Sequence, residues 1–381
     1  MKRQFHSSLA LTLVFILALA LPILFTRFRG GDVSEQEKRT LAAFPRLVTE
    51  EGSLNRAVKK ETENWLSDHI GFRSSLIRLA SAIKYYGFRQ SSSDQVHIGK
   101  DGWFYYVPND NLEIATGKYP LSDETLAQIL QIHLAIREEL REKGIEYVVV
   151  MPTSKVSIYP EYLRYGSGEL RRTPVDVVAD YLEENSDLRV VRLKEVMLQG
   201  KEHSQVYYKT DTHWTYEGAY LGYREIVRRL NEWGLCDAAP VEPRFEDFAY
   251  TGEFGAMLGL ELAPEQSRRW VIESDSVQED IPCERNDAFR ALLEEEKIYN
   301  PCHYYRNTAS EGKKLLIFGD SMFGGFDLPA LLAEHYAETS YIWTQTYRRS
   351  LVEEMQPDIV IFELTERFLN ALPYFNSSFL T

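Results

Sequence analysis

The chain has 381 residues, of which 44% are hydrophobic and 26% are charged, so it can bury one large core or two modest ones. Its formal net charge is -14 at pH 7. Binding to a polyanion needs a basic face that releases counterions, so this balance argues against nucleic acid as a partner. The three cysteines include no Cys-x-x-Cys pair, the spacing typical of zinc and redox sites.

The N-terminal end carries a mostly apolar segment at 9–26, preceded by Lys2 and Arg3. As a helix it reaches about 30 Å, which is just enough to cross a bilayer. No small-x-small cleavage site precedes the following charges, which favours an uncleaved anchor over a removed signal peptide. We expect a cytoplasmic stub at 1–8, one transmembrane helix at 9–26, and the rest outside the cytoplasm. A buried structural helix remains the alternative.

A stem is predicted at 27–90. It begins as a charged segment that Pro45 closes, and between 53 and 86 apolar residues recur near helical spacing with a break around Gly71. This pattern indicates two helices.

The region at 91–381 alternates helical and strand patterns, which predicts a three-layer α/β domain with a mainly parallel sheet. It opens with a hairpin pattern at 96–107. We expect helices at 122–144 (with Ser122 as cap), 174–185, 218–233 and 329–336, and buried strands at 147–151, 188–193, 313–318 and 358–364. An acidic, turn-rich segment at about 241–312 breaks the alternation, so we expect a cap or insertion near the active site.

Ser321 is the candidate nucleophile. It follows the predicted strand at 313–318 in the motif Gly319-Asp320-Ser321, and functional groups of parallel α/β sheets collect at the carboxyl ends of strands. A serine needs a base to become nucleophilic, and a backbone amide at such a turn can hold an oxyanion. Taken alone, the motif fits a simple helix cap better.

Asp211 and His213 supply a candidate base with its orienting carboxylate. They stand two residues apart ahead of a helix, close enough for the carboxylate to fix the imidazole tautomer. With Ser321, all three roles of a catalytic triad are present, so a helix cap and a core histidine explain the pattern less well. His203 lies in the same region, but its spacing from His213 matches no compact zinc site, and we expect no metal.

Several motifs together resemble a known family. Gly319-Asp320-Ser321 is similar to the nucleophile block of SGNH-type esterases and acyltransferases, and Thr210–Ala219 resembles the Asp-x-His-Trp block of the alginate O-acetyltransferase-like branch and the related DHHW-type proteins. Further blocks of the resemblance are 37–45, 65–73, 150–160, 252–260 and 357–367. In that branch the Asp and His precede the Ser, as they do here.

The resemblance implies transfer of an acetyl or related acyl group to a hydroxyl of an extracytoplasmic polysaccharide. It also implies a multi-span membrane acyltransferase as the supplier of the acyl unit, and no cofactor. The chain lacks a recognisable Gly and Asn block for the oxyanion hole, which leaves only the Ser321 amide for that role.

Four further residues are predicted to bind substrate because they follow strands that end at the same sheet edge. They are Lys155 and Tyr159 after the strand at 147–151, and Glu366 and Arg367 after the strand at 358–364. The alternative for each pair is a solvated ion pair or hydrogen bond at the rim.

The sequence thus predicts an O-acetyltransferase anchored in the cell membrane. Two alternatives stay open, namely a carbohydrate esterase of the same fold and a non-catalytic protein that binds cell-wall polysaccharide.

Overall fold

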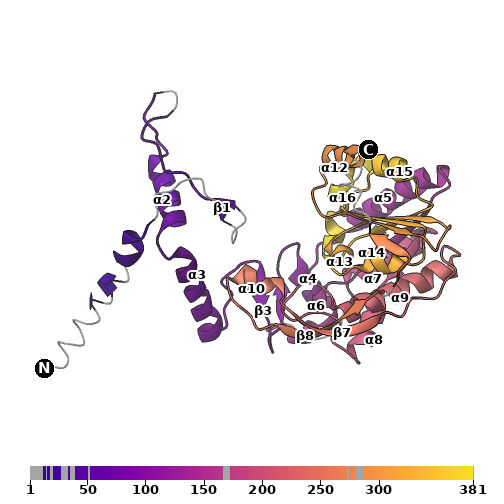
Figure 1. Cartoon of the computed structure of the whole chain (residues 1–381), viewed down its shortest axis with the longest axis horizontal. Helices are drawn as coiled ribbons and strands as arrows, with labels where there is room; N and C mark the ends of the chain where they lie inside the picture. The colour runs from indigo at the N-terminus through magenta and orange to yellow at the C-terminus, as the bar shows by residue number, and fades with distance from the viewer. Residues whose placement is uncertain are drawn as a thin grey trace. The chain divides into compact units, whose positions relative to one another are not determined.

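The computed structural model describes residues 12–13, 15–17, 20–26, 33–34, 39–49, 52–165, 172–272, 274–279 and 287–380. The chain divides into two compact units (Figure 1). The first comprises Met1–Ser93 with Ala256–Glu261, and the second comprises Asp94–Gly255 with Leu262–Thr381. The predicted cytoplasmic stub at 1–8 lies outside the described residues.

Among the described residues of the first unit, the successive helices at 58–69 and 73–82 are separated near Gly71, as the apolar spacing predicts. The elements of this unit are β1 (Val33–Ser34), β2 (Arg39–Thr40), α2 (Val58–His69), α3 (Arg73–Ala82) and η1 (Ile83–Gly87). A Cβ added at Gly71 would lie 2.7 Å from the carbonyl oxygen of Pro22, which explains why a glycine separates the helices. In the part of the chain that the structure describes, no helix has both the length and the apolar composition needed to cross a membrane. Several residues of the predicted span at 9–26 lie outside that part.

A seven-stranded mixed sheet forms the centre of the second unit, in the order β6-β5-β13-β11-β12-β10-β9. The parallel strands are β6 (Arg189–Arg192), β5 (Glu146–Met151), β13 (Ile359–Glu363), β11 (Lys314–Gly319) and β12 (Glu338–Trp343). β10 (His303–Asn307) and β9 (Val277–Glu279) add two antiparallel strands at one edge. The predicted mainly parallel α/β sheet is confirmed, with this antiparallel extension.

Helices cover both faces of the sheet, which gives three layers. Successive strand residues point to opposite faces, so Val148 of β5 packs in one buried cluster and Val149 in the other. Figure 1 shows α5 and α15 on one side of the sheet and α8 and α9 on the other. The helices of this unit are α4 (Asn111–Thr116), α5 (Asp123–Glu142), α6 (Lys155–Ile158), η2 (Pro160–Tyr162), α7 (Pro174–Asn185), α8 (Lys194–Lys201), α9 (Tyr216–Glu232), α10 (Glu253–Leu258, which continues into the first unit), α12 (Asp287–Glu295), α13 (Ser321–Gly324), α14 (Leu328–Ala333), α15 (Arg349–Met355), η3 (Glu366–Ala371), α16 (Leu372–Phe375) and η4 (Ser377–Phe379). Ser122 caps α5 as predicted, because its hydroxyl accepts the N–H of Thr125 at 3.1 Å.

Among the described residues of the second unit, two hairpins lie outside the central sheet. β3 (Val96–Ile98) pairs with β4 (Phe104–Tyr106), which confirms the hairpin predicted at 96–107. β7 (Arg244–Tyr250) pairs with β8 (Glu265–Val271) in the first part of the segment expected as an insertion. The last part of that segment forms β9 and β10, so it belongs to the core sheet and not to a cap.

Candidate active site

Ser321 lies at the carboxyl end of β11, where it begins α13. The preceding carboxylate, Asp320, accepts the N–H of Thr365 at 3.0 Å and its hydroxyl at 2.8 Å. These bonds tie the serine turn to the residues that follow β13. At Gly319 an added Cβ would lie 2.6 Å from Oε2 of Glu363, so a glycine is needed for the strand to pass this buried carboxylate.

Ser321, His213 and Asp211 form a continuous hydrogen-bonded chain. Nε2 of His213 lies 2.8 Å from Oγ of Ser321, and Nδ1 lies 2.7 Å from Oδ1 of Asp211. With the Nδ1 proton donated to the carboxylate, Nε2 is the nitrogen that can take the hydroxyl proton. The three residues predicted from the sequence are therefore brought together in the geometry of a nucleophile, a base and an orienting carboxylate.

Asp211 has partners for both carboxylate oxygens. Oδ2 accepts the hydroxyl of Tyr250 at 2.8 Å and the N–H of Glu253 at 3.0 Å. Burial by itself acts to raise the pKa of Asp211, but the hydrogen bonds from His213 and Glu253 and the charge of His213 outweigh it. The pKa of Asp211 is consequently held below its ordinary value, and the carboxylate is ionised at neutral pH.

The Asp-His loop, defined as residues 208–213, is fixed by the hairpin β7–β8. The carboxylate of Glu265 on β8 accepts the N–H of Lys209 at 2.9 Å and the N–H of Thr210 at 2.8 Å. At Gly252 an added Cβ would lie 2.1 Å from the carbonyl oxygen of Thr210. Only a glycine allows the end of the hairpin to approach the loop this closely.

Glu253 places a second carboxylate beside Asp211 and His213. One possible ligand atom from each of the three residues lies within 4.8 Å of the others, a spacing that could hold a metal ion. Both oxygens of Asp211 and both ring nitrogens of His213 are, however, engaged in hydrogen bonds with protein groups. Burial and the neighbouring Asp211 raise the pKa of Glu253, which disfavours its anionic form. The arrangement favours acid–base chemistry over metal binding.

Three of the four predicted substrate-binding residues point into the protein. Lys155 donates to the Asp-His loop, the hydroxyl of Tyr159 accepts the N–H of Val206 at 3.0 Å, and the carboxylate of Glu366 accepts the N–H of Ser154 at 2.9 Å. All three side chains are buried. Their substrate-binding role stays a prediction, and these contacts support a role in holding loops at the sheet edge.

Arg367 is also buried, at 5% exposed, but differs from the other three in its hydrogen bonds. Its Nε is buried without a hydrogen-bond partner, and its side chain donates no hydrogen bond to any residue that the structure describes. The guanidinium carbon lies 4.7 Å from the ring centroid of Phe368 and 5.9 Å from that of Tyr106. Its charge acts on the carboxylate of Glu253, so an unpaired cation lies within electrostatic reach of the site.

Three residues of the site are absent from the sequence-based prediction, namely Tyr250, Glu253 and Glu265. Glu253 lies in the block at 252–260 that carries part of the family resemblance, and this was the available signal. Tyr250 and Glu265 have no comparable signal, because their contacts depend on how the hairpin β7–β8 packs against the Asp-His loop.

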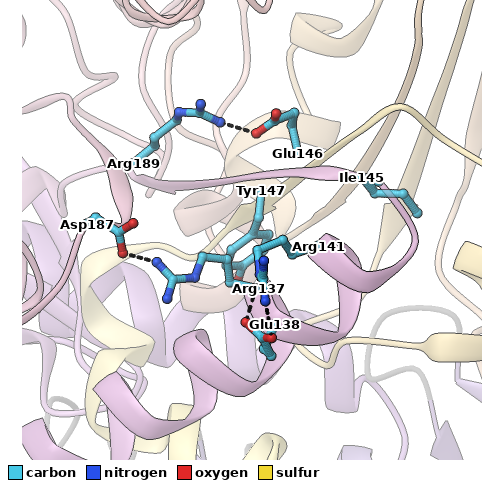
Figure 2. Close-up of a pocket in the computed structure, with 9 residues that line it drawn as sticks. Arg137, Glu138, Arg141, Ile145, Glu146, Tyr147, Asp187 and Arg189 are labelled. Carbon is cyan, nitrogen blue, oxygen red and sulfur yellow. Dashed lines mark hydrogen bonds and ion pairs between the residues drawn. The ribbon is translucent and has the colours of Figure 1, made fainter.

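A surface pocket of about 570 Å³ lies at the opposite edge of the sheet, beside the start of β5 and β6 (Figure 2). Its charged residues form ion pairs between Arg137 and Asp187, Arg141 and Glu138, and Arg189 and Glu146. The described residues that line it include no serine, cysteine or histidine. The described lining thus lacks a serine or cysteine nucleophile, whereas Ser321 lies at the carboxyl ends of the strands.

Comparison with known proteins places the chain in a family. The family model described as SGNH hydrolase-like domain, acetyltransferase AlgX, matches residues 96–299, which is more than half of the chain. The chain belongs to this family. The matched range contains Asp211 and His213 and ends before Ser321.

Individual relatives are more distant. The chain is 24% identical over 185 residues to the probable alginate O-acetylase AlgJ of Pseudomonas fluorescens, and the match covers 46% of this chain and 43% of the relative. It is 22% identical over 213 residues to AlgJ of Pseudomonas syringae pv. tomato, with 55% and 52% covered. The chain thus spans about half the length of these curated relatives.

A solved structure shows the same fold. PatB1 of Bacillus cereus, determined with a sulfonyl adduct, superposes with a TM-score of 0.53 at 16% identity, covering 74% of this chain and 99% of that chain. Together with the family match, this likeness shows an SGNH-hydrolase-like α/β fold.

Proposed function

We propose that this chain is an O-acetyltransferase that holds an acetyl group on Ser321 and passes it to a hydroxyl of an extracytoplasmic polysaccharide. The observation that carries the proposal is the hydrogen-bonded chain from Ser321 through His213 to Asp211. The family match and the AlgJ relatives, described as probable alginate O-acetylases, support an acetyl group and a polysaccharide acceptor.

The first half-reaction forms an acetyl-enzyme. Oγ of Ser321 attacks the carbonyl carbon of an acetyl donor while Nε2 of His213 takes the hydroxyl proton. The bond from the acetyl carbon to the leaving group then breaks, and His213 returns the proton to that group. The ionised Asp211 stabilises the imidazolium that exists between these two transfers.

The second half-reaction reverses the proton transfers. A sugar hydroxyl gives its proton to His213 and attacks the acetyl carbon, and Ser321 leaves with the proton that His213 then donates. The products are an acetylated glycan and the free enzyme, and no cofactor or metal takes part in either step.

Two groups are suited to bind the reacting acyl group and the substrate. The N–H of Ser321 lies in the first turn of α13, where backbone N–H groups have no acceptor within the helix. This N–H also has no acceptor elsewhere among the described residues. It is therefore the donor we assign to the oxyanion. We assign contact with substrate oxygens to Arg367, because its guanidinium donates no hydrogen bond to described residues.

We also propose a cellular location for this chain and a source for its acyl group. The composition of 9–26 supports a single membrane anchor with the second unit outside the cytoplasm. On that side of the membrane an acyl donor has to be delivered, and the family resemblance implies a multi-span membrane acyltransferase as the partner that delivers it.

The test compares Ser321→Ala with Ser186→Ala in the full chain. Ser186 follows α7, and among the described residues its hydroxyl hydrogen-bonds only to backbone groups of its own turn. We expect Ser321→Ala to abolish turnover of an activated acetyl ester and labelling by a sulfonyl fluoride, a reagent suggested by the sulfonyl adduct of PatB1. Ser186→Ala should retain both. Undiminished turnover by Ser321→Ala would contradict the proposal.

A carbohydrate esterase is the second candidate, because water can replace the sugar hydroxyl as acceptor. The side chain of His213 is 14% exposed, so solvent reaches the base in the absence of a glycan. The two functions separate when acetyl release to water is measured with and without polysaccharide. Acetyl-glycan formation that exceeds hydrolysis supports the transferase, and hydrolysis unchanged by any glycan supports the esterase.

A further inference from the structure

Lys155 is a buried lysine whose ammonium forms no ion pair with any described residue. Its side chain is 3% exposed at the first position of α6, directly after the turn that follows β5. No carboxylate oxygen of the described residues lies within 4.0 Å of its ammonium nitrogen, which is the longest distance for an ion pair. Buried lysines normally have such a partner, because removing an unpaired charge from water is costly. The direct hydrogen bonds of this ammonium therefore have to go to groups other than carboxylates.

Backbone carbonyls of the Asp-His loop take that role. Nζ of Lys155 donates to the carbonyl oxygens of Asp211 at 2.6 Å, Tyr208 at 3.0 Å and Lys209 at 3.2 Å. An ammonium has three donors, so all of them are directed at this one loop. The carbonyls of Tyr208 and Asp211 accept no other hydrogen bond from the described residues. Lys155 is thus the single donor for two buried acceptors beside the proposed base.

Aromatic rings enclose the same ammonium. It lies 4.8 Å from the ring centroid of Phe254, 5.3 Å from that of Tyr105 and 5.7 Å from that of Trp103. Ring faces attract a cation without using its N–H donors, so they hold the ammonium in place and leave its donors to the loop.

The charged groups around Lys155 come from several elements. The carboxylates of Asp211 in the loop, Glu265 on β8 and Glu253 on α10 favour the ammonium, but burial is the larger effect and lowers the pKa of Lys155 to about 7. The neighbouring cation is Lys209, whose Nζ lies 5.9 Å from the ring centroid of Trp103. Of the three rings around Lys155, that of Tyr105 is titratable. Above neutral pH the amine keeps two donors for three carbonyls.

We infer that Lys155 is a positioning residue for the proposed acyl transfer, whose three hydrogen bonds fix the backbone of the Asp-His loop so that Asp211 and His213 stay aligned with Ser321. The inference rests on the proposed function for its effect on catalysis. Without these donors two buried carbonyls lose their partners, and the loop has to shift to satisfy them. A displacement of about 1 Å in such a site reduces the rate about 100-fold.

The test replaces Lys155 by methionine, which has nearly the same length but neither charge nor donors. Lys194→Met is the matched control, since Lys194 is also a buried lysine but pairs with Asp176 on another helix. Turnover of an activated acetyl ester, thermal unfolding and the low-field NMR signal of the His213 Nδ1 proton are measured for both variants and the wild type.

For Lys155→Met we expect kcat to fall about 100-fold with KM unchanged, and the His213 signal to shift or disappear. Lys194→Met should keep both the wild-type kcat and the signal, whatever its loss in melting temperature. The inference is overturned if Lys155→Met retains kcat and the His213 signal, or if it loses no more activity than the control. Should the methionine variant not fold, the same comparison is made with Lys155→Gln, which keeps a donor but is one bond shorter.

Two further readouts keep this test independent of the proposed function. If the wild type does not turn over the ester, the proposed function fails, while the His213 signal still reports whether Lys155 aligns the loop. Lysine labelled with ¹⁵N reports on the ammonium directly: a buried ammonium with three acceptors exchanges slowly, so the wild type should show a protected Nζ signal that Lys155→Met lacks and Lys194→Met keeps. Absence of this signal at acidic pH would overturn the inference that Lys155 holds the Asp-His loop.

Discussion

The two ends of the parallel strands in the central sheet carry similar residue types in opposite environments. We call them the amino edge, where β5 and β6 start, and the carboxyl edge, where β11 ends beside Ser321. At the amino edge, the pairs of the pocket in Figure 2 join arginines and carboxylates that solvent reaches, such as Arg189 with Glu146. At the carboxyl edge, Asp211 is 3% exposed and its two oxygens accept four hydrogen bonds, two of them from His213. Carboxylates thus form solvent-screened ion pairs at the amino edge. At the carboxyl edge, Asp211 is buried and both of its oxygens are hydrogen-bonded.

This difference shows which edge can perform chemistry. Exposed pairs gain little because water and salt screen them. Buried groups interact more strongly, and burial also shifts the pKa of Lys155 and Glu253 while hydrogen bonds hold the pKa of Asp211 low. If the comparison is correct, substitutions at the carboxyl edge reduce kcat about tenfold or more, and those at the amino edge change it little.

The largest effect is expected for His213→Ala. Loss of the base should reduce kcat for an activated acetyl ester about 10⁵-fold or more, because Ser321 then has no acceptor for its proton. His203→Ala is the matched control, since His203 lines a separate surface pocket between α8 and α9. A His213→Ala enzyme with more than a tenth of wild-type kcat would contradict the claim that the carboxyl edge performs the chemistry.

Asp211→Asn should reduce kcat about 10⁴-fold while the fold is kept, because an amide cannot stabilise the imidazolium or fix its tautomer. In the wild type the Asp211 carboxylate should stay ionised as the pH falls through the ordinary aspartate pKa of 3.8 and become protonated only below that value, since its pKa is lowered, and the carboxyl ¹³C signal measures this. Asp187→Asn, at the amino edge, is the control for kcat. Equal activities of the two variants would show that burial at the carboxyl edge has no catalytic consequence.

Tyr250→Phe removes one hydrogen bond to the charged carboxylate and leaves the ring. We expect kcat to fall about tenfold, which corresponds to about 1.4 kcal/mol, the lower end for a bond to a charged group. Tyr304→Phe provides the control, because its hydroxyl donates to Glu338 on the far strands of the sheet. If both variants match the wild type, Tyr250 has no part in holding Asp211.

Stability should respond to Lys155 in alkaline solution. Between pH 7 and 10.5 the unfolded chain has this lysine protonated while the folded protein does not, so unfolding takes up a proton. The free energy of unfolding should therefore rise with pH across this window, and the rise should be smaller in Lys155→Met. Urea unfolding at several pH values measures it, and parallel profiles for both proteins would contradict the lowered pKa.

The smallest effect is expected at the amino edge. Arg189→Ala should change the free energy of unfolding by about 0 to 1 kcal/mol and leave kcat at the wild-type value. The change should shrink further at high salt. A loss of activity in this variant would mean that the pocket in Figure 2 communicates with the carboxyl edge.

Much of the fold could be predicted because burial leaves a periodic pattern. The apolar runs of β5, β11 and β13 are short and continuous, and they place Ser321 at a strand end. β12 escapes prediction because Thr339 and Ser340 interrupt its apolar pattern, although both are buried. β9 and β10 are short antiparallel strands in a polar, turn-rich segment, so nothing local distinguishes them from an insertion.

The candidate site shows the same limit. The residue types and order of Asp211, His213 and Ser321 indicate a triad, because nucleophile and base chemistry restricts the choice of side chain. The groups that support them, such as Tyr250 and Lys155, act through contacts between distant segments. The position of Lys155 after β5 predicts that it lies near the carboxyl ends of the strands, yet the direction of its side chain toward the Asp-His loop depends on tertiary packing.

The central claim is that Ser321 carries the acetyl group. Its most direct test is the mass of the intact chain, and of its peptides, after brief reaction with an activated acetyl ester and acid quenching. The account predicts a gain of one acetyl group located on Ser321 in the wild type and no gain in Ser321→Ala. An acetyl group that appears on another residue, or equally in both proteins, would contradict it.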